Sequence, residues 1–188
     1  MNETVVLERD DLRRTLRRIA HEIAEKNPDP AALAIVGIHT RGALLARRLH
    51  ASLTELTGAE VPIGDIDISF YRDDVGAKSP AMQPVVHASH IDFDLSGRTV
   101  VLVDDVLFTG RTVRAALDAL RDFGRPSAIR LAALVDRGGR ELPIQADFVG
   151  LTDRNVPITH RVKVKLAETD GADEIVIEPR DADRRPHP

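Results

Sequence analysis

Two adjacent carboxylates and a nearby group of hydroxyl residues carry the clearest chemistry in this sequence. Asp104 and Asp105 follow the apolar run Val100–Val103, and Thr-Gly-Arg-Thr at 109–112 comes shortly afterwards. This order predicts a buried strand that ends at the acid pair, then a turn, then a helix. Hydroxyls and backbone N–H groups at a helix N-terminus suit a phosphate monoester. The two carboxylates suit sugar hydroxyls or hydrated Mg²⁺ instead.

The segment therefore offers neighbouring sites for a phosphate and for a hydroxyl-rich or metal-bound group, and a phosphorylated ribose combines both. The alternative is a strand end with a capping acid pair and no ligand. Two other classes are excluded. A P-loop NTPase needs Lys and Ser/Thr after its GxxxxG frame, but Ala43 and Leu44 follow that frame at 37–42. A receiver domain would carry its acid pair on the first strand of a shorter chain.

Length and composition indicate a single globular domain. The chain has 188 residues, of which 43% are apolar, 5 are Phe and 1 is Tyr, and it has no cysteine. Without cysteine, a disulfide framework, a thiol nucleophile, a zinc–thiolate site and an iron–sulfur cluster are excluded. So few aromatic side chains argue against a platform that stacks single-stranded bases. No run of 18 apolar residues exists and residues 1–10 lack a signal-peptide pattern, so we expect a cytoplasmic protein.

The net charge of −4 is confined to one end of the chain. Residues 168–188 contain seven acidic side chains and three arginines, which leaves 23 basic and 23 acidic residues in the rest. The body of the protein is therefore neutral overall. A polyanion would have to bind a local basic patch, because no general positive field attracts it.

Apolar runs that alternate with helical patterns must position the acid pair. This alternation predicts an α/β fold with βα units around a mostly parallel sheet. Ligands of such sheets bind at the carboxyl ends of the strands, where the acid pair is expected. We expect strands at 33–38, 66–70, 99–103 and 129–135, with weaker patterns at 146–149, 161–166 and 174–177.

Three helices are expected. Asp10 or Asp11 can cap the first, and its apolar positions share one face: Leu12, Leu16, Ile19, Ala20, Ile23 and Ala24. The second should cover 42–56 and the third 110–123. The aperiodic stretch 72–90 is either an active-site lid or a plain surface excursion. We expect one domain over 1–179 and a disordered tail at 180–188.

The acid-pair segment, from Val100 to Thr112, resembles the phosphoribosyl pyrophosphate (PRPP) signature of type I phosphoribosyltransferases. Four further segments, at 37–49, 67–74, 124–127 and 134–144, occur in the same order as in the PyrR family. The resemblance extends from Val5 to Leu166, nearly the whole chain, and the combination of motifs is specific although no single one is. It implies a type I phosphoribosyltransferase fold, which is a doubly wound, mostly parallel sheet with a small lobe, made of the two ends of the chain, over the base site.

The resemblance also implies a role for each matching residue. Asp104 and Asp105 would face the ribose hydroxyls and the metal-bound PRPP, acting as catalytic residues and, through water or PRPP, as Mg²⁺ contacts. The loop 39–42 would hold pyrophosphate and 109–112 the 5′-phosphate. The implied PRPP-binding residues, within and beyond the motif from Val100 to Thr112, are Thr40, Arg41, Arg72, Asp104, Asp105, Thr109, Gly110, Arg111 and Thr112.

The implied reaction joins the ribosyl phosphate of PRPP to uracil and gives UMP and pyrophosphate. The family also regulates the pyrimidine operon by binding its leader mRNA in a manner that depends on UMP or UTP, and it forms homodimers or homotetramers. The alternative is a phosphoribosyltransferase that has lost RNA binding or uses another base.

RNA binding requires a basic surface, which this chain offers only locally. Basic side chains form a stripe along the first helix, and the alternative for this stripe is a solvated face paired with Glu22 and Glu25. The sequence departs from the family pattern at three positions where basic residues are usual, which are Gly139, Gln145 and Leu151. The candidate RNA-binding residues are Arg14, Arg18, His21, Arg137 and Arg140.

Overall fold

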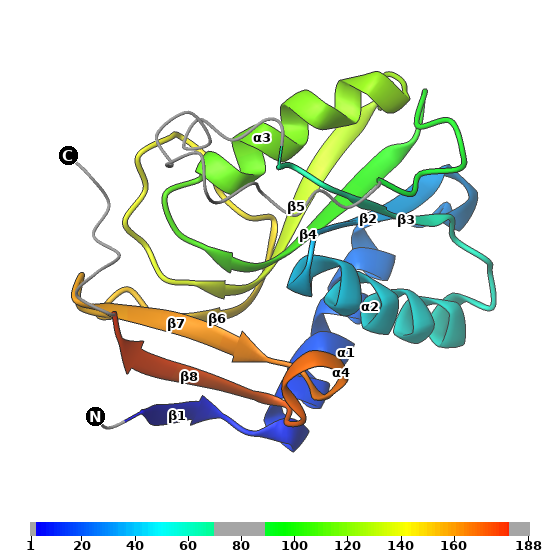
Figure 1. Cartoon of the computed structure of the whole chain (residues 1–188). Coiled ribbons are helices and arrows are strands. Elements are labelled where there is room, and N and C mark those ends of the chain that lie inside the picture. The colour runs from blue at the N-terminus through cyan, green and yellow to red at the C-terminus, as the bar shows by residue number, and fades with distance from the viewer. Residues whose placement is uncertain (1–2, 70–88, 181–188) are drawn as a thin grey trace.

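The centre of the protein is a five-stranded parallel sheet. The structure is a computed structural model that describes residues 3–69 and 89–180 (Figure 1). The strand order is β3-β2-β4-β5-β6, and every neighbouring pair is parallel. The strands are β2 (Leu33–Ile38), β3 (Ile63–Ile66), β4 (Thr99–Leu107), β5 (Ala128–Asp136) and β6 (Phe148–Thr152).

Helices cover both faces of this sheet, as predicted for a doubly wound fold (Figure 1). One buried cluster lies between the sheet and the helices α1 (Arg9–Lys26) and α2 (Arg41–Thr57). A second cluster lies between the opposite face and α3 (Arg111–Leu120). Two short 3₁₀ turns, η1 (Pro30–Ala32) and η3 (Arg121–Phe123), precede β2 and follow α3. In the described part of the chain, no helix combines the length and apolarity that crossing a bilayer requires.

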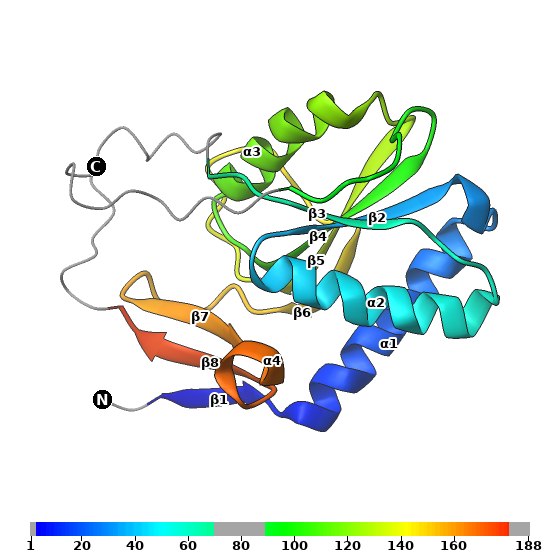
Figure 2. The same cartoon turned by 45° about the vertical axis from the view of Figure 1, so that its right-hand side comes forward.

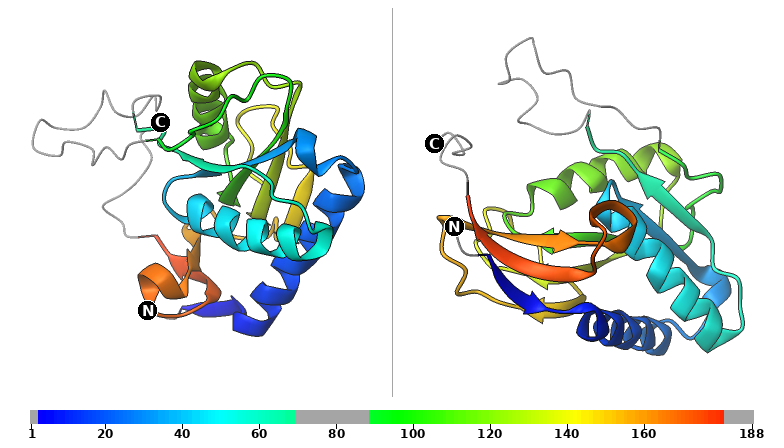
Figure 3. Two further views of the ribbon diagram at one scale, coloured as in Figure 1. Left: turned by 90° about the vertical axis from the view of Figure 1, so that its right-hand side faces the viewer. Right: turned by 60° about the horizontal axis from the view of Figure 1, so that its bottom comes forward.

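The two ends of the chain build a small lobe, which confirms the expected architecture. Its antiparallel sheet has the order β1-β8-β7 and consists of β1 (Thr4–Leu7), β8 (Glu174–Pro179) and β7 (His160–Lys165). The short helix α4 (Ala167–Asp170) connects β7 to β8. Figure 2 shows the lobe beside the N-terminal end of α1, and both views of Figure 3 show β1 alongside β8. Its apolar side chains join the cluster under α1 and α2.

The first helix follows its predicted face but not its predicted cap. Leu12, Leu16, Ile19, Ala20 and Ile23 are buried, and Ala24 is partly buried. The helix begins at Arg9, so the prediction that Asp10 or Asp11 caps it is wrong. Both acids lie inside the first turn, where they interact favourably with the helix dipole instead.

Several strands differ from the sequence prediction. The strand expected at 66–70 ends at Ile66, because the Asp67 carboxylate accepts the Ser69 amide at 2.8 Å and thereby turns the chain. β4 runs through the acid pair to Leu107 rather than stopping before it. β6 begins at Phe148, and β1 was not predicted. Residues 70–88 and 181–188, with most of the expected lid and the expected tail, lie outside the described residues.

Candidate active site

A hollow of about 330 Å³ opens at the carboxyl ends of β2 and β4. Parallel sheets bind ligands at this edge, so its position agrees with the expectation from the sequence. The hollow brings together five predicted PRPP-binding residues. Its walls consist of His39, Thr40, Arg41, Gly42, Asp67, Ile68, Ser69, Asp104, Asp105, Val106 and Thr112.

The acid pair lies within β4, and its carboxylates are bound back to their own strand. The Asp105 amide donates to Asp104 Oδ1, and the Val106 amide donates to Asp105 Oδ1, both at 2.9 Å. Burial and the charge of Asp105 raise the pKa of Asp104 well above its usual value. Burial also raises the pKa of Asp105, although the Val106 amide and the Arg41 charge oppose it. A buried and a half-buried carboxylate this close favour a shared proton, or a donor or cation from a ligand.

The predicted signature segment from Val100 to Thr112 divides into a core part and a part that lines the hollow. Val100 is fully buried in the cluster beneath α3, and the three residues that follow it in β4 are buried as well. None of these four residues lines the hollow, whereas Asp104, Asp105, Val106 and Thr112 do. The start of the segment therefore positions the acid pair through packing. The part of the segment that lines the hollow is shorter than the whole segment that resembles the PRPP signature.

The loop between β2 and α2 approaches the acid pair very closely. A Cβ on Gly42 would lie 2.5 Å from the Val103 carbonyl oxygen and 3.3 Å from the Asp104 Cα. A Cβ on Gly37 would lie 2.4 Å from the Ala43 Cα. Only glycine therefore permits this packing at either position. The loop contains a cis peptide bond between His39 and Thr40.

Arg41 connects this loop to the small lobe. Its Nη2 donates to the two carboxylate oxygens of Asp170 at 3.0 and 3.3 Å. The Arg41 Nε is buried and has no hydrogen-bond partner in the described residues. Burial opposes ionisation of Asp170, but the Leu166 amide, the Thr169 hydroxyl and Arg41 together lower the pKa of this carboxyl. Arg41 thus lies in the hollow with one face anchored to an ionised acid.

The predicted phosphate turn forms the start of α3. Gly110 adopts the left-handed conformation (φ 92°) before the helix, and only Thr112 of this turn lines the hollow. Arg111 points to Glu141, with 2.6 Å between the Nε and the carboxylate. The amides of Glu141 and Leu142 donate to the Thr109 carbonyl at 3.0 and 3.1 Å. The loop after β5 therefore supports the turn from outside.

The sequence prediction missed Asp67 and Ser69 as residues of the hollow. Asp67 is buried, and its Oδ1 accepts both the amide and the hydroxyl of Ser69. These two residues could have been found from their position in the sequence. They follow β3, which pairs with β2 in parallel, so they lie at the same edge of the sheet as the loop after β2. Arg72 lies outside the described residues, so its predicted role stays a prediction.

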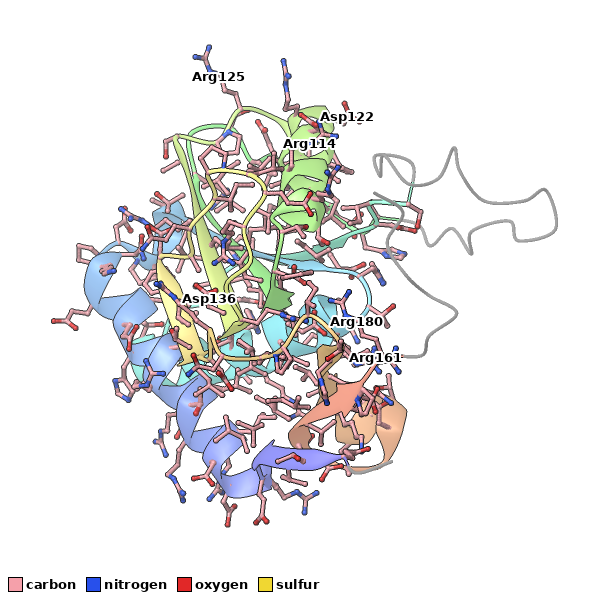
Figure 4. The ribbon with its side chains drawn as sticks, turned by 90° about the vertical axis from the view of Figure 1, so that its left-hand side faces the viewer. Arg114, Asp122, Arg125, Asp136, Arg161 and Arg180 are labelled. Atoms are coloured by element: carbon pink, nitrogen blue, oxygen red, sulfur yellow. The ribbon has the colours of Figure 1, made fainter. Side chains whose placement is uncertain are left out.

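The two candidate RNA-binding arginines after β5 have internal partners. Arg137 is buried, stacks 4.2 Å from the Phe108 ring centroid, and donates to the His160 carbonyl at 3.2 Å. Arg140 pairs with Asp136 at 2.7 Å and donates to the Phe108 carbonyl at 2.8 Å. Figure 4 shows Asp136 at the end of β5, with Arg161 and Arg180 on the small lobe.

The candidates on α1 are more accessible. Arg14 pairs with Asp11, and Arg18 pairs with Glu22. The second pair agrees with the alternative interpretation of this stripe as a solvated helix face. Arg18 also donates to the carbonyls of Val149 and Gly150 at 3.0 and 2.7 Å, which fastens α1 to β6. Arg14, Arg18 and His21 are all exposed.

The fold and the hollow with its acid pair define a phosphoribosyltransferase. Residues 7–168 match the sequence model of the phosphoribosyl transferase domain. Hypoxanthine phosphoribosyltransferase of Trypanosoma cruzi superposes with a TM-score of 0.67 at 17% identity, over 94% of this chain and 97% of that chain. Hypoxanthine phosphoribosyltransferase of Staphylococcus aureus superposes with a TM-score of 0.63 at 19% identity, over 79% of this chain and 76% of that chain. These similarities concern the fold.

Closer relatives define the family. The chain is 59% identical to the Bifunctional protein PyrR of Roseiflexus sp. (strain RS-1), over 91% of this chain and 92% of the relative. It is 55% identical to the Bifunctional protein PyrR of Deinococcus radiodurans, over 95% and 97%. The chain belongs to the PyrR family. The sequence prediction of a uracil phosphoribosyltransferase that also regulates the pyrimidine operon is thereby confirmed at the level of the family.

Proposed function

We propose that the hollow binds PRPP and that its residues transfer the ribosyl 5-phosphate to N1 of uracil. One observation carries this proposal: the acid pair of β4 shares a single hollow with Arg41 and Thr112. The hollow therefore combines acceptors for sugar hydroxyls with donors for two phosphate-bearing groups. A phosphorylated, pyrophosphorylated ribose has this pattern of chemical groups.

Each end of PRPP has a suitable partner. The buried Arg41 Nε, which has no partner among the described residues, supplies a donor for pyrophosphate oxygens, together with the amides of the loop 39–42. The start of α3 supplies backbone N–H groups and the Thr112 hydroxyl for the 5′-phosphate. Asp104 and Asp105 line the same hollow and accept the ribose hydroxyls.

The acid pair also fits Mg²⁺, which prefers a few carboxylate oxygens and retains several waters. Burial raises the pKa of both carboxyl groups, and a cation or the hydroxyl donors of a ribose would stabilise their ionised forms. Mg²⁺ bound with PRPP would neutralise the charge of the pyrophosphate leaving group. Asp104 and Asp105 would hold it directly or through water.

The chemistry needs positioning and electrostatics rather than a protein nucleophile. The bond from ribose C1 to the pyrophosphate oxygen breaks and the bond to uracil N1 forms, while N1 gives up its proton to the leaving pyrophosphate or to water. Arg41 stabilises the negative charge that grows on pyrophosphate. The walls of the hollow hold the ribose against the acid pair and limit its exposure to water.

The double variant Asp104→Asn with Asp105→Asn tests this assignment. We expect it to fold, because neutral amides replace carboxyl groups that already resist ionisation, and to lose UMP formation from PRPP and uracil. Asp118→Asn, at an exposed position of α3, is the matched control and should retain turnover. UMP formation at the wild-type rate in a folded double variant would overturn the assignment.

The second part of the proposal is binding of the pyrimidine leader mRNA, enhanced by uridine nucleotides, by a homodimer or homotetramer in the cytoplasm. Its support is the exposed stripe of Arg14, Arg18 and His21 on α1. Arg137 and Arg140 already bind carbonyl groups, so their contribution to RNA contact would be indirect.

RNA gel shifts with and without UMP test this part. Arg14→Ala with His21→Ala should weaken leader binding and reduce its salt dependence, since each lost phosphate contact lowers the slope by about 1. Arg125→Ala, which removes an exposed arginine far from α1, is the control (Figure 4). Unaltered leader binding in the α1 variant would contradict this surface. Absence of leader binding by the wild-type protein would favour a phosphoribosyltransferase without RNA binding.

A further inference from the structure

Two histidine side chains converge on one carboxylate oxygen beside the hollow. His39 Nε2 and His90 Nδ1 both contact Asp65 Oδ2, the second at 3.3 Å. One ligand atom of each residue lies within 4.8 Å of the others. The three residues come from the loop after β2, from β3, and from the segment that precedes β4.

The backbone fixes the three residues relative to one another. The His39 amide donates to the Ile66 carbonyl at 3.0 Å. Asp65 and His90 exchange two backbone hydrogen bonds, at 3.0 and 2.9 Å, as an antiparallel bridge. Gly64 permits this approach, because a Cβ there would lie 2.7 Å from the His90 carbonyl oxygen. The cluster therefore rests on ordered sheet structure, which suits a ligand site.

The donor set specifies the kind of ion. Two imidazoles with one carboxylate suit Zn²⁺ and neighbouring transition metals, whereas Mg²⁺ prefers oxygen ligands. Zn–ligand bonds of about 2.0–2.1 Å place tetrahedral ligands about 3.3 Å apart, so small side-chain rotations suffice. The His90 side chain is 65% exposed, which leaves the cluster open to solvent, while those of His39 and Asp65 are 18% and 13% exposed.

We propose that His39, Asp65 and His90 form a binding site for a divalent transition metal of the Zn²⁺ type. Water or a ligand oxygen completes the coordination, as in sites with three protein ligands. Arg47 lies 4.0 Å from the other carboxylate oxygen, Asp65 Oδ1. It therefore leaves Asp65 Oδ2 to the ion and helps to orient the carboxylate.

The ion would act on the loop that carries Arg41. His39 both contributes to the cluster and lines the hollow, and Thr40 and Arg41 follow it directly. A bound ion would tie the start of this loop to β3. The site is separate from the acid pair, so it extends the proposed function without depending on it.

The test uses the untagged full-length protein and titration with Co²⁺, followed by its visible d–d absorption, with competition by Zn²⁺. We expect one ion per chain. At 100 times the dissociation constant, Zn²⁺ should raise the midpoint of thermal unfolding by about 5–10 °C. His90→Ala and Asp65→Asn should each weaken binding at least about tenfold, because each removes one ligand.

Three controls separate this site from other sources of binding. His21→Ala removes an exposed histidine outside the cluster and should leave Co²⁺ binding unchanged. The double variant Asp104→Asn with Asp105→Asn should also bind Co²⁺ normally, even where it has lost UMP formation. Circular dichroism confirms that each variant is folded. Failure of the wild-type protein to bind Co²⁺, or equal affinity in a folded His90→Ala variant, would mean that the cluster is only a hydrogen-bonded triad.

Discussion

Substitution of Gly42 by alanine tests whether close packing of the loop against β4 positions the pyrophosphate site. The added Cβ would lie 2.5 Å from the Val103 carbonyl oxygen, although Cβ contacts below 3.0 Å essentially never occur. β4 pairs with β2 on one side and β5 on the other, so its backbone has little freedom to retreat. The loop itself must therefore move away by about 0.5 Å or more.

The structure gives a magnitude for both stability and activity. Overpacking of a well-packed site costs about 1–3 kcal/mol, and the better helix propensity of alanine returns up to about 1 kcal/mol, because Gly42 lies in the first turn of α2. We expect a net loss of roughly 1–2 kcal/mol of unfolding free energy. A displacement of 1 Å near reacting groups can cost about 100-fold in rate, so kcat/KM for PRPP should fall about 10- to 100-fold.

Chemical denaturation measures the loss of stability, and initial rates of UMP formation at varied PRPP measure the loss of activity. Gly58→Ala is the matched control, because a Cβ there meets nothing within 4 Å and only the positive φ of 65° opposes it. This control should lose about 1 kcal/mol of stability and keep its kcat/KM. If Gly42→Ala loses the same stability as the control and retains the wild-type kcat/KM, the close approach does not position the loop.

Three further predictions concern charged side chains. Asp170→Asn removes the charge that anchors Arg41. Because the side chains of Asp170 and Arg41 are 17% and 32% exposed, we expect a loss of about 1 kcal/mol in PRPP binding free energy, which corresponds to a roughly fivefold rise in KM for PRPP. Glu168→Gln is the control, and an unchanged KM in Asp170→Asn would contradict the anchor. Because the pKa of Asp104 is raised, its ionisation destabilises the folded state as pH rises from its ordinary value of 3.8 through the folded pKa. Asp104→Asn should therefore have a larger free energy of unfolding than the wild type at pH 7. Denaturation measured at a series of lower pH values should show this difference disappear as the pH falls below 3.8. Arg137→Ala should cost about 1–3 kcal/mol in thermal denaturation because it removes the donor to the His160 carbonyl and empties the space over Phe108, and a change below 0.5 kcal/mol would refute that packing.

Periodic burial made most of the fold predictable from the sequence. The six residues of β2 are all buried, and continuous apolar runs of this kind are typical of a parallel sheet covered on both faces. The predicted face of α1 is confirmed for the same reason. The prediction failed at 66–70, where Ile66 and Ile68 alternate with polar residues as in a strand. The local hydrogen bonds of Asp67 to Ser69 outweigh that pattern and turn the chain.

The candidate site was predictable where its residues are close in sequence. The acid pair, its following turn and the loop after β2 each occupy one segment, and the rule for parallel sheets brings their strand ends together. Partners from distant segments gave no such signal. Asp170 is 129 positions from Arg41, and α4 is too short for a periodic pattern. Arg137 and Arg140 were predicted as RNA contacts from the family resemblance and their charge, neither of which reveals the backbone carbonyls that they bind.

The small lobe and the loop after β2 are joined through α2. Arg41 begins this helix and binds Asp170, while Arg48 binds both Glu168 and Asp173 at 2.5 and 2.7 Å. The two arginines are seven positions apart, which places them on the same face of a helix. That face therefore meets the acidic segment around α4 at two points. A displacement of the lobe relative to α2 must therefore either break the Arg41–Asp170 contact or move Arg41 together with the lobe. In both cases the orientation of the Arg41 guanidinium, which lines the hollow, changes.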